Sequence, residues 1–142
     1  MSIAIVTDST SDIPKELCDK YNITTVPLSV IFGEETFTDN GVDITVEQFY
    51  KKLKTSEKLP TTAQPTPQDF LKTYTELLKD YETIISIHIS KKMSGTIDSA
   101  EMAKKELEGK DIVIVDSELV HMPLGFLVLK AAQLAKEGKS KE

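Results

Sequence analysis

Hydroxyl side chains are concentrated in three short segments of this sequence, and each segment is followed by a predicted helix. The segments are residues 7–12 (TDSTSD), 61–67 (TTAQPTP) and 94–96 (SGT). The first follows an apolar run typical of a buried strand, so we expect it at the carboxyl edge of a sheet, where α/β folds bind ligands. Hydroxyls and the free amides of a helix start both donate hydrogen bonds to oxyanions. The sequence therefore predicts a site for a carboxylate or a phosphate.

The residues of these segments differ in how well a purely structural role explains them. Gly95 lets the backbone come close to a ligand, whereas Ser94 either contacts the ligand or caps the helix that follows, and its turn alone favours the cap. Thr66 is explained as a helix cap, but Thr62 has no structural role visible in the sequence. The candidate ligand-binding residues, including two that follow the predicted strand at 111–115, are Ser9, Thr10, Thr62, Ser94, Gly95, Thr96, Ser117 and His121.

Asp8 invites an enzymatic interpretation, because an aspartate at the end of a strand can accept a phosphoryl group. The spacing is similar to the Asp-x-Asp start of haloacid-dehalogenase-like phosphatases, but Thr10 stands where the second carboxylate is needed to hold magnesium. A structural role for Asp8 in holding turn amides is therefore favoured. His88 has apolar neighbours and is interpreted as a core histidine. We expect no catalytic residue, no cofactor and no metal site.

Charge, cysteine content and the length of the apolar runs limit the kinds of partner that this protein can bind and the compartments in which we expect it. A formal net charge of −6 over 142 residues, without a Lys/Arg cluster, argues against nucleic acid. Cys18 is the single cysteine, which excludes an internal disulfide. No basic segment precedes an apolar stretch at the N-terminus, and no apolar run reaches the length of a membrane span. We expect a cytoplasmic protein with one core.

The order of the predicted elements defines the fold class. Apolar runs predict strands at residues 3–7, 26–32, 83–89 and 111–115, and a short exposed strand at 36–38. Helices are predicted over residues 12–21, from the Thr45–Gln48 capping box, from Thr66, from 94–96 and over 123–136, with a loop at 54–66. This alternation predicts a single α/β domain over residues 1–142, with a mostly parallel sheet of about four strands and helices on both faces.

Taken in order, the motifs of this chain resemble those of the DegV family of bacterial fatty-acid-binding proteins. They are residues 7–12 (TDSTSD), 26–28 (VPL), 61–67 (TTAQPTP), 89–96 (ISKKMSGT) and 115–117 (VDS). The resemblance implies a long-chain fatty acid whose carboxylate is held by hydroxyls, with Thr62 and Ser94 at the matching positions. It also implies that the protein presents the fatty acid to a separate fatty acid kinase for phospholipid synthesis and carries no phosphoryl-transfer machinery itself.

The chain departs from the family in two ways. Family members are about twice as long, and their second domain closes over the ligand and adds basic head-group contacts, so this chain resembles the N-terminal half. Leu119, His121 and Pro123 stand where the family has small residues. We therefore expect weak or no fatty-acid binding and an exposed apolar patch that favours self-association, with transient membrane contact left open. The alternatives are a metal-dependent phosphatase or hydrolase that uses Asp8, and a non-catalytic interaction domain.

Overall fold

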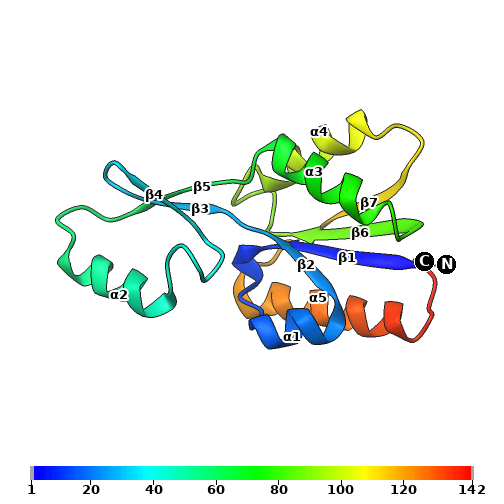
Figure 1. The fold of residues 1–142 in the computed structure, drawn as a ribbon, viewed down its shortest axis with the longest axis horizontal. Coiled ribbons are helices and arrows are strands. Elements are labelled where there is room, and N and C mark those ends of the chain that lie inside the picture. The colour runs from blue at the N-terminus through cyan, green and yellow to red at the C-terminus, as the bar shows by residue number, and fades with distance from the viewer. Residues whose placement is uncertain (1, 142) are drawn as a thin grey trace.

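The structure is a computed structural model that describes residues 2–141. Its elements follow one another along the chain as strands and helices, with one short 3-10 helix, η1 (Figure 1). Their bounds are β1 Ile3–Asp8, η1 Ser9–Ser11, α1 Lys15–Tyr21, β2 Ile23–Val26, β3 Ser29–Phe32, β4 Glu35–Thr38, α2 Val46–Thr55, β5 Thr61–Ala63, α3 Pro67–Leu77, β6 Thr83–His88, α4 Thr96–Glu106, β7 Asp111–Asp116 and α5 His121–Lys136.

The main sheet has four parallel strands in the order β2-β1-β6-β7. Helices α3 and α4 cover one face, and α1 and α5 cover the other (Figure 1). Side chains of β1 alternate between the two cores: Val6 packs with Phe70 and Tyr74 of α3, whereas Ile5 packs with Leu124 of α5. Because both faces are covered, the strands read as nearly continuous apolar runs. The predicted fold class is confirmed.

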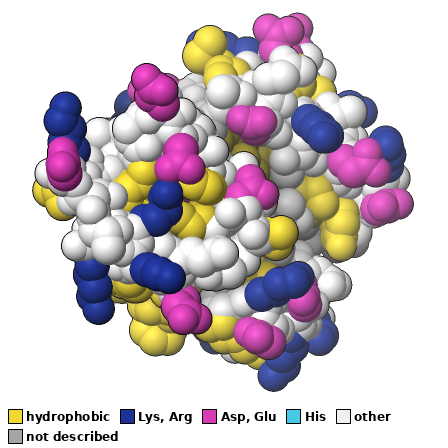
Figure 2. Space-filling model, turned by 60° about the vertical axis from the view of Figure 1, so that its left-hand side comes forward, with side chains coloured by type: hydrophobic (Ala, Val, Ile, Leu, Met, Phe, Trp, Pro, Cys, Tyr) yellow, Lys and Arg dark blue, Asp and Glu magenta, His cyan; other side chains and the backbone are white. Residues whose placement is uncertain are grey.

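A second sheet forms a lobe beside the main body. Its three strands are antiparallel in the order β4-β3-β5, and α2 packs on it around Phe32 and Phe49. The lobe also carries exposed apolar side chains, among them Val46 and Leu59. Figure 2 looks toward this end of the molecule and shows hydrophobic side chains at the surface between charged ones. The lobe therefore has a small core of its own, and several apolar side chains stand exposed among the charged ones on its surface.

Two predictions were wrong in this lobe. Residues 26–32 do not form one strand, because β2 ends at Val26 and β3 begins at Ser29 in the other sheet. Pro27 has no N–H to give to a ladder, and the Leu28 N–H donates to the Ser9 hydroxyl at 3.0 Å. The predicted loop at 54–66 contains β5, which pairs with β3 through its backbone. Its three exposed residues have no apolar pattern that would reveal a strand.

The helix starts follow the sequence signals closely. Thr45 and Gln48 form the predicted capping box of α2, and Thr66 forms another with Asp69 at the start of α3. In each, the threonine hydroxyl accepts the N–H three residues on, at 3.2 Å. The last helix begins at His121, two residues before the predicted start at 123. His121 is therefore the first residue of α5 and does not lie in the preceding loop.

Candidate functional site

A cleft of about 370 Å³ lies between the lobe and the carboxyl ends of β1 and β6. It is formed by η1, β3, β5, the segment after β6 and the turn before α4. Four of the eight predicted site residues line it. The complete lining is Thr10, Leu28, Val30, Asp39, Thr62, Gln64, Ile89, Met93, Ser94 and Gly95. The cleft thus joins hydroxyl side chains from three separate segments to an apolar wall.

Strand β5 places Thr62 in the cleft. Thr62 lies opposite Val30 in the antiparallel ladder, and both side chains line the cleft. Because side chains alternate along a strand, the neighbouring Thr61 faces the other side of the small sheet. Within residues 2–141 no group is hydrogen-bonded to the Thr62 hydroxyl, so its hydrogen is available to a ligand.

Ser94 has a structural and a cleft-facing role together. Its hydroxyl oxygen accepts the Thr96 N–H at 3.3 Å and lies 2.9 Å from the Thr96 hydroxyl. Thr96 is fully buried and lies outside the lining of the cleft. If the Thr96 hydroxyl donates to Ser94, the Ser94 hydrogen is free for a ligand. Thr96 therefore orients Ser94 from the interior of the protein, and a direct ligand contact by Thr96 is not supported.

Gly95 is needed for a reason that the sequence did not show. A Cβ atom on Gly95 would lie 2.4 Å from Oε1 of Gln64. The Gln64 amide donates to the Gly95 carbonyl oxygen and to the Ser99 hydroxyl, both at 3.2 Å. Gly95 thus makes room for Gln64, which ties β5 to α4. Gln64 lies inside the hydroxyl-rich segment 61–67, but nothing in the sequence singles it out.

Three further predicted residues lie outside the cleft and have structural partners. The Ser9 hydroxyl accepts the Leu28 N–H. The Ser117 hydroxyl donates to the His88 carbonyl oxygen at 2.6 Å. His121 lies 2.7 Å from Asp12 through its Nδ1 atom and is 71% exposed. These residues hold the chain around the strand ends and do not face the cleft.

Asp8 is fully buried directly behind the cleft. One of its oxygens accepts the Ile89 N–H at 3.1 Å and lies 2.9 Å from His88 Nδ1, and the other accepts the Thr10 N–H at 3.0 Å and the Thr10 hydroxyl. Burial raises the pKa of Asp8, but the hydrogen bonds from His88, Thr10 and Ile89 outweigh it and lower the pKa. The carboxylate therefore has no open side from which it could attack a phosphate.

Charge is sparse at the cleft. Asp39 is its one charged lining residue, and no Lys, Arg or His of residues 2–141 lines it. An anionic ligand therefore depends on hydroxyl donors in this part of the chain. Asp39 was not singled out in the sequence, because its place at the cleft arises from the pairing of β4 with β3 and from the hydrogen bond of its N–H to the Leu28 carbonyl oxygen. In the described residues, no three His, Cys, Asp or Glu side chains are grouped to hold a metal ion.

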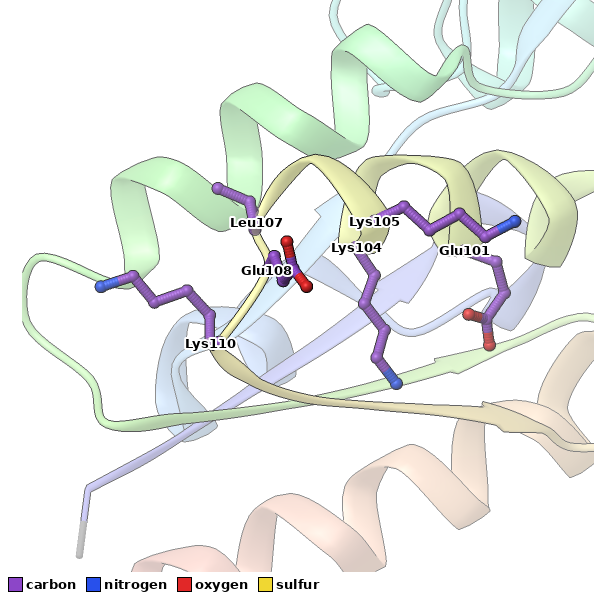
Figure 3. Close-up of a pocket in the computed structure, with 7 residues that line it drawn as sticks. Glu101, Lys104, Lys105, Leu107, Glu108 and Lys110 are labelled. Carbon is purple, nitrogen blue, oxygen red and sulfur yellow. The ribbon is translucent and has the colours of Figure 1, made fainter.

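A second hollow, of about 460 Å³, lies at the carboxyl end of α4. Figure 3 shows that its side chains belong to the last turns of α4 and the following turn, and that the amines of Lys104, Lys105 and Lys110 point away from one another. Glu101 and Glu108 stand among them. Because these charges do not converge on a point, this hollow is not a candidate site.

The fold and the cleft define an α/β domain with a hydroxyl-lined cleft at the carboxyl edge of its main sheet. The family model described as "Uncharacterised protein, DegV family" matches residues 2–142. The chain therefore belongs to the DegV family. It is 42% identical to Protein DegV of Bacillus subtilis over 140 residues, which is 99% of this chain and 50% of that protein. A DegV domain-containing protein of Clostridium perfringens is 46% identical over 136 residues, 96% of this chain and 48% of that one.

Solved structures of relatives are described as fatty-acid-binding proteins. The structure of DegV from Bacillus subtilis, "a fatty acid binding protein", matches with a TM-score of 0.92 at 42% identity. A DegV family protein from Thermus thermophilus, also described by its fatty-acid binding, matches with a TM-score of 0.91 at 38% identity. Each match covers 99% of this chain and 50% of the other. The chain thus spans about half the length of the relatives it matches. Among its described residues, no helix is both long and apolar enough to cross a membrane.

Proposed function

We propose that this chain supplies one wall of a fatty-acid site, in which Thr62 and Ser94 donate hydrogen bonds to the ligand carboxylate. The proposal rests on one observation, that Thr62 and Ser94 line the same cleft. The two residues come from distant parts of the sequence, since their hydrogen-bonded neighbours Gln64 and Gly95 are 31 positions apart. Relatives that share this fold are described as fatty-acid-binding proteins. Hydroxyl donors are suited to a carboxylate, which only accepts hydrogen bonds.

The apolar wall of the cleft supports a hydrocarbon ligand. Leu28, Val30 and Ile89 are buried at its base, whereas Met93 is 63% exposed at its rim. Each methylene group buried there gains about 0.8 kcal/mol. Because the cleft is open and no cationic side chain of residues 2–141 lines it, we expect this chain alone to bind a fatty acid weakly. The rest of the ligand surface would be covered by protein that relatives have and this sequence does not include.

We further propose that the protein carries its ligand to a separate fatty acid kinase and does not itself transfer phosphate. Asp8, the strand-end carboxylate directly behind the cleft, is buried and accepts hydrogen bonds through both of its oxygens. Asp39, the charged group in the cleft, has no second carboxylate beside it in the lining that could help to hold a metal ion. The geometry of the cleft thus fits binding and presentation better than chemistry on Asp8.

A binding titration with palmitic acid tests the carboxylate contacts. The unmodified chain should bind, and the double variant Thr62→Ala/Ser94→Ala should lose at least about tenfold in affinity, because a hydrogen bond to a charged group contributes roughly 1.5–3 kcal/mol. Thr61→Ala is the matched control, since Thr61 is the neighbouring threonine on the opposite side of β5. Equal losses in the double variant and in Thr61→Ala would refute the site, and absence of binding by every form would refute the function.

A further inference from the structure

Behind the cleft, four buried side chains form an unbroken chain of hydrogen bonds. The Tyr74 hydroxyl donates to Ser86 at 2.8 Å, Ser86 lies 2.6 Å from His88 Nε2, and His88 Nδ1 lies 2.9 Å from Asp8 Oδ2. Tyr74, Ser86, His88 and Asp8 are all fully buried. Buried polar groups of this kind are retained only when each is hydrogen-bonded, and here every member has a partner.

At its Asp8 end, this chain of hydrogen bonds reaches the wall of the cleft. Asp8 Oδ2 accepts the Ile89 N–H at 3.1 Å, and Oδ1 accepts both the N–H and the hydroxyl of Thr10. Thr10 and Ile89 both line the cleft, as does Thr62. The Asp8 side chain is thus bonded to two separate wall segments, η1 and the segment after β6.

Counting hydrogens assigns a direction to every bond in the chain. Tyr74 donates to Ser86, so the Ser86 hydrogen goes to His88 Nε2, the other hydrogen-bond partner of this hydroxyl among residues 2–141. His88 is then protonated on Nδ1, and this N–H donates to Asp8. The Thr10 hydroxyl donates to Asp8 as well. Its oxygen therefore faces the cleft with lone pairs only and acts toward a ligand as an acceptor.

The histidine ring is also fixed by packing. The Phe70 ring stands edge-on to it, with centroids 5.1 Å apart and an interplanar angle of 83°. The His88 carbonyl oxygen accepts the Ser117 hydroxyl at 2.6 Å, which explains Ser117 as a support of this strand end. Although Ser86, His88 and Asp8 follow the order of contacts of a hydrolase triad, Ser86 is fully buried beneath Tyr74 and no substrate can reach it.

We propose that His88 and Asp8 are positioning residues of the cleft: His88 holds Asp8 in place, and Asp8 fixes the Thr10 hydroxyl and the Ile89 backbone that form its wall. This inference rests on the proposed function, since it assigns a role at the same site. A positioning residue acts through others, so its removal should change ligand binding by more than its effect on stability would explain.

Two substitutions of His88 separate positioning from general support of the core. His88→Asn places an amide nitrogen where Nδ1 stands and retains the bond to Asp8, whereas His88→Gln reaches toward Ser86 and loses it. Both remove part of a buried ring and should lower the unfolding midpoint. Palmitic acid affinity should fall about tenfold in His88→Gln and stay within about twofold of the unmodified chain in His88→Asn. Tyr74→Phe, at the far end, should lower stability and leave affinity unchanged.

Equal affinities of the two folded His88 variants, or an equal loss in Tyr74→Phe, would overturn the proposal. A measurement without ligand decides it if the variants fail to fold or no form binds palmitic acid. Nitrogen-15 NMR of histidine in the unmodified chain should show His88 neutral and protonated on Nδ1, with the Ile89 amide proton in slow exchange. A proton on Nε2, or an Ile89 amide that exchanges freely, would refute the positioning role independently of the fatty-acid function.

Discussion

The side-chain amide of Gln64 donates to the carbonyl oxygen of Gly95 at 3.2 Å and thereby joins β5 to the turn before α4. These two residues flank the pair of hydroxyls assigned to the ligand, Thr62 and Ser94. The same amide also donates to Ser99 at 3.2 Å. Because β5 has only three residues in its ladder, this cross-link helps to hold β5 against the turn before α4 at the cleft.

Gly95→Ala should therefore disturb Gln64 first. The new Cβ atom would lie 2.4 Å from Gln64 Oε1, so the flexible amide moves away and both of its hydrogen bonds are lost. We expect a destabilisation of about 1–2 kcal/mol, measured by urea unfolding. In a Gln64→Ala background the same substitution should have little further effect, and additive losses in the double variant would show that the two residues do not act together.

The low pKa of Asp8 predicts a dependence of stability on pH. Hydrogen bonds lower its pKa below the ordinary value of 3.8. The charged form of Asp8 is therefore more stable in the native state than in the unfolded chain. This contribution is fully present above the unfolded value and is lost as the pH falls through the lower native value. The free energy of unfolding should fall steeply below about pH 4 in the unmodified chain. Asp8→Asn should be less stable at neutral pH and should show a shallower fall, and parallel curves would contradict this role.

The exposed apolar side chains of the lobe predict self-association. Val42, Val46, Tyr50 and Leu59 are 80%, 72%, 55% and 83% exposed, and Val46 and Tyr50 share one face of α2 because they are four residues apart. The apparent mass in sedimentation should rise with concentration, and Val46→Lys/Tyr50→Lys should abolish the rise. Met102, on α4 and 56% exposed, gives the control Met102→Lys, which should leave association intact. A concentration-independent monomer would refute the prediction.

Fatty-acid affinity should also differ between this chain and a relative of full length. The chain spans 50% of DegV from Bacillus subtilis, which is described as a fatty-acid-binding protein. Each methylene group left uncovered weakens binding by about 0.8 kcal/mol, or roughly fourfold in affinity. Palmitic acid should therefore bind this chain far more weakly than the relative when both are titrated under the same conditions. Equal affinities would mean that this half alone encloses the ligand.

The sequence predicts this fold wherever side-chain pattern and backbone structure agree. Strands β1, β6 and β7 are apolar because helices cover both of their faces, and the capping boxes at Thr45 and Thr66 mark two helix starts. Strand β5 has no such pattern, because its exposed residues are held by backbone pairing with β3 alone. The break between β2 and β3 depends on the contact of Leu28 with Ser9, which is a tertiary contact.

The residues of the candidate site likewise include some that the sequence identifies and others that only the folded structure brings to the cleft. Thr62 and Ser94 are identified by motif, because each belongs to a hydroxyl-rich segment whose order along the chain resembles a family. Asp39 and Gln64 enter the cleft only through the pairing of the lobe strands, and the sequence shows neither. Ser9, Ser117 and His121 have the right residue type near the right strand ends, yet local hydrogen bonds occupy them.

Native mass spectrometry of the chain with palmitic acid or its methyl ester tests the central claim most directly, because the two ligands differ only in the ionisable head group. The account predicts a one-to-one complex with the acid, little with the ester, and loss of the acid complex in Thr62→Ala/Ser94→Ala but not in Thr61→Ala. Equal binding of acid and ester, unaffected by the double variant, would contradict recognition of the carboxylate by these two hydroxyls.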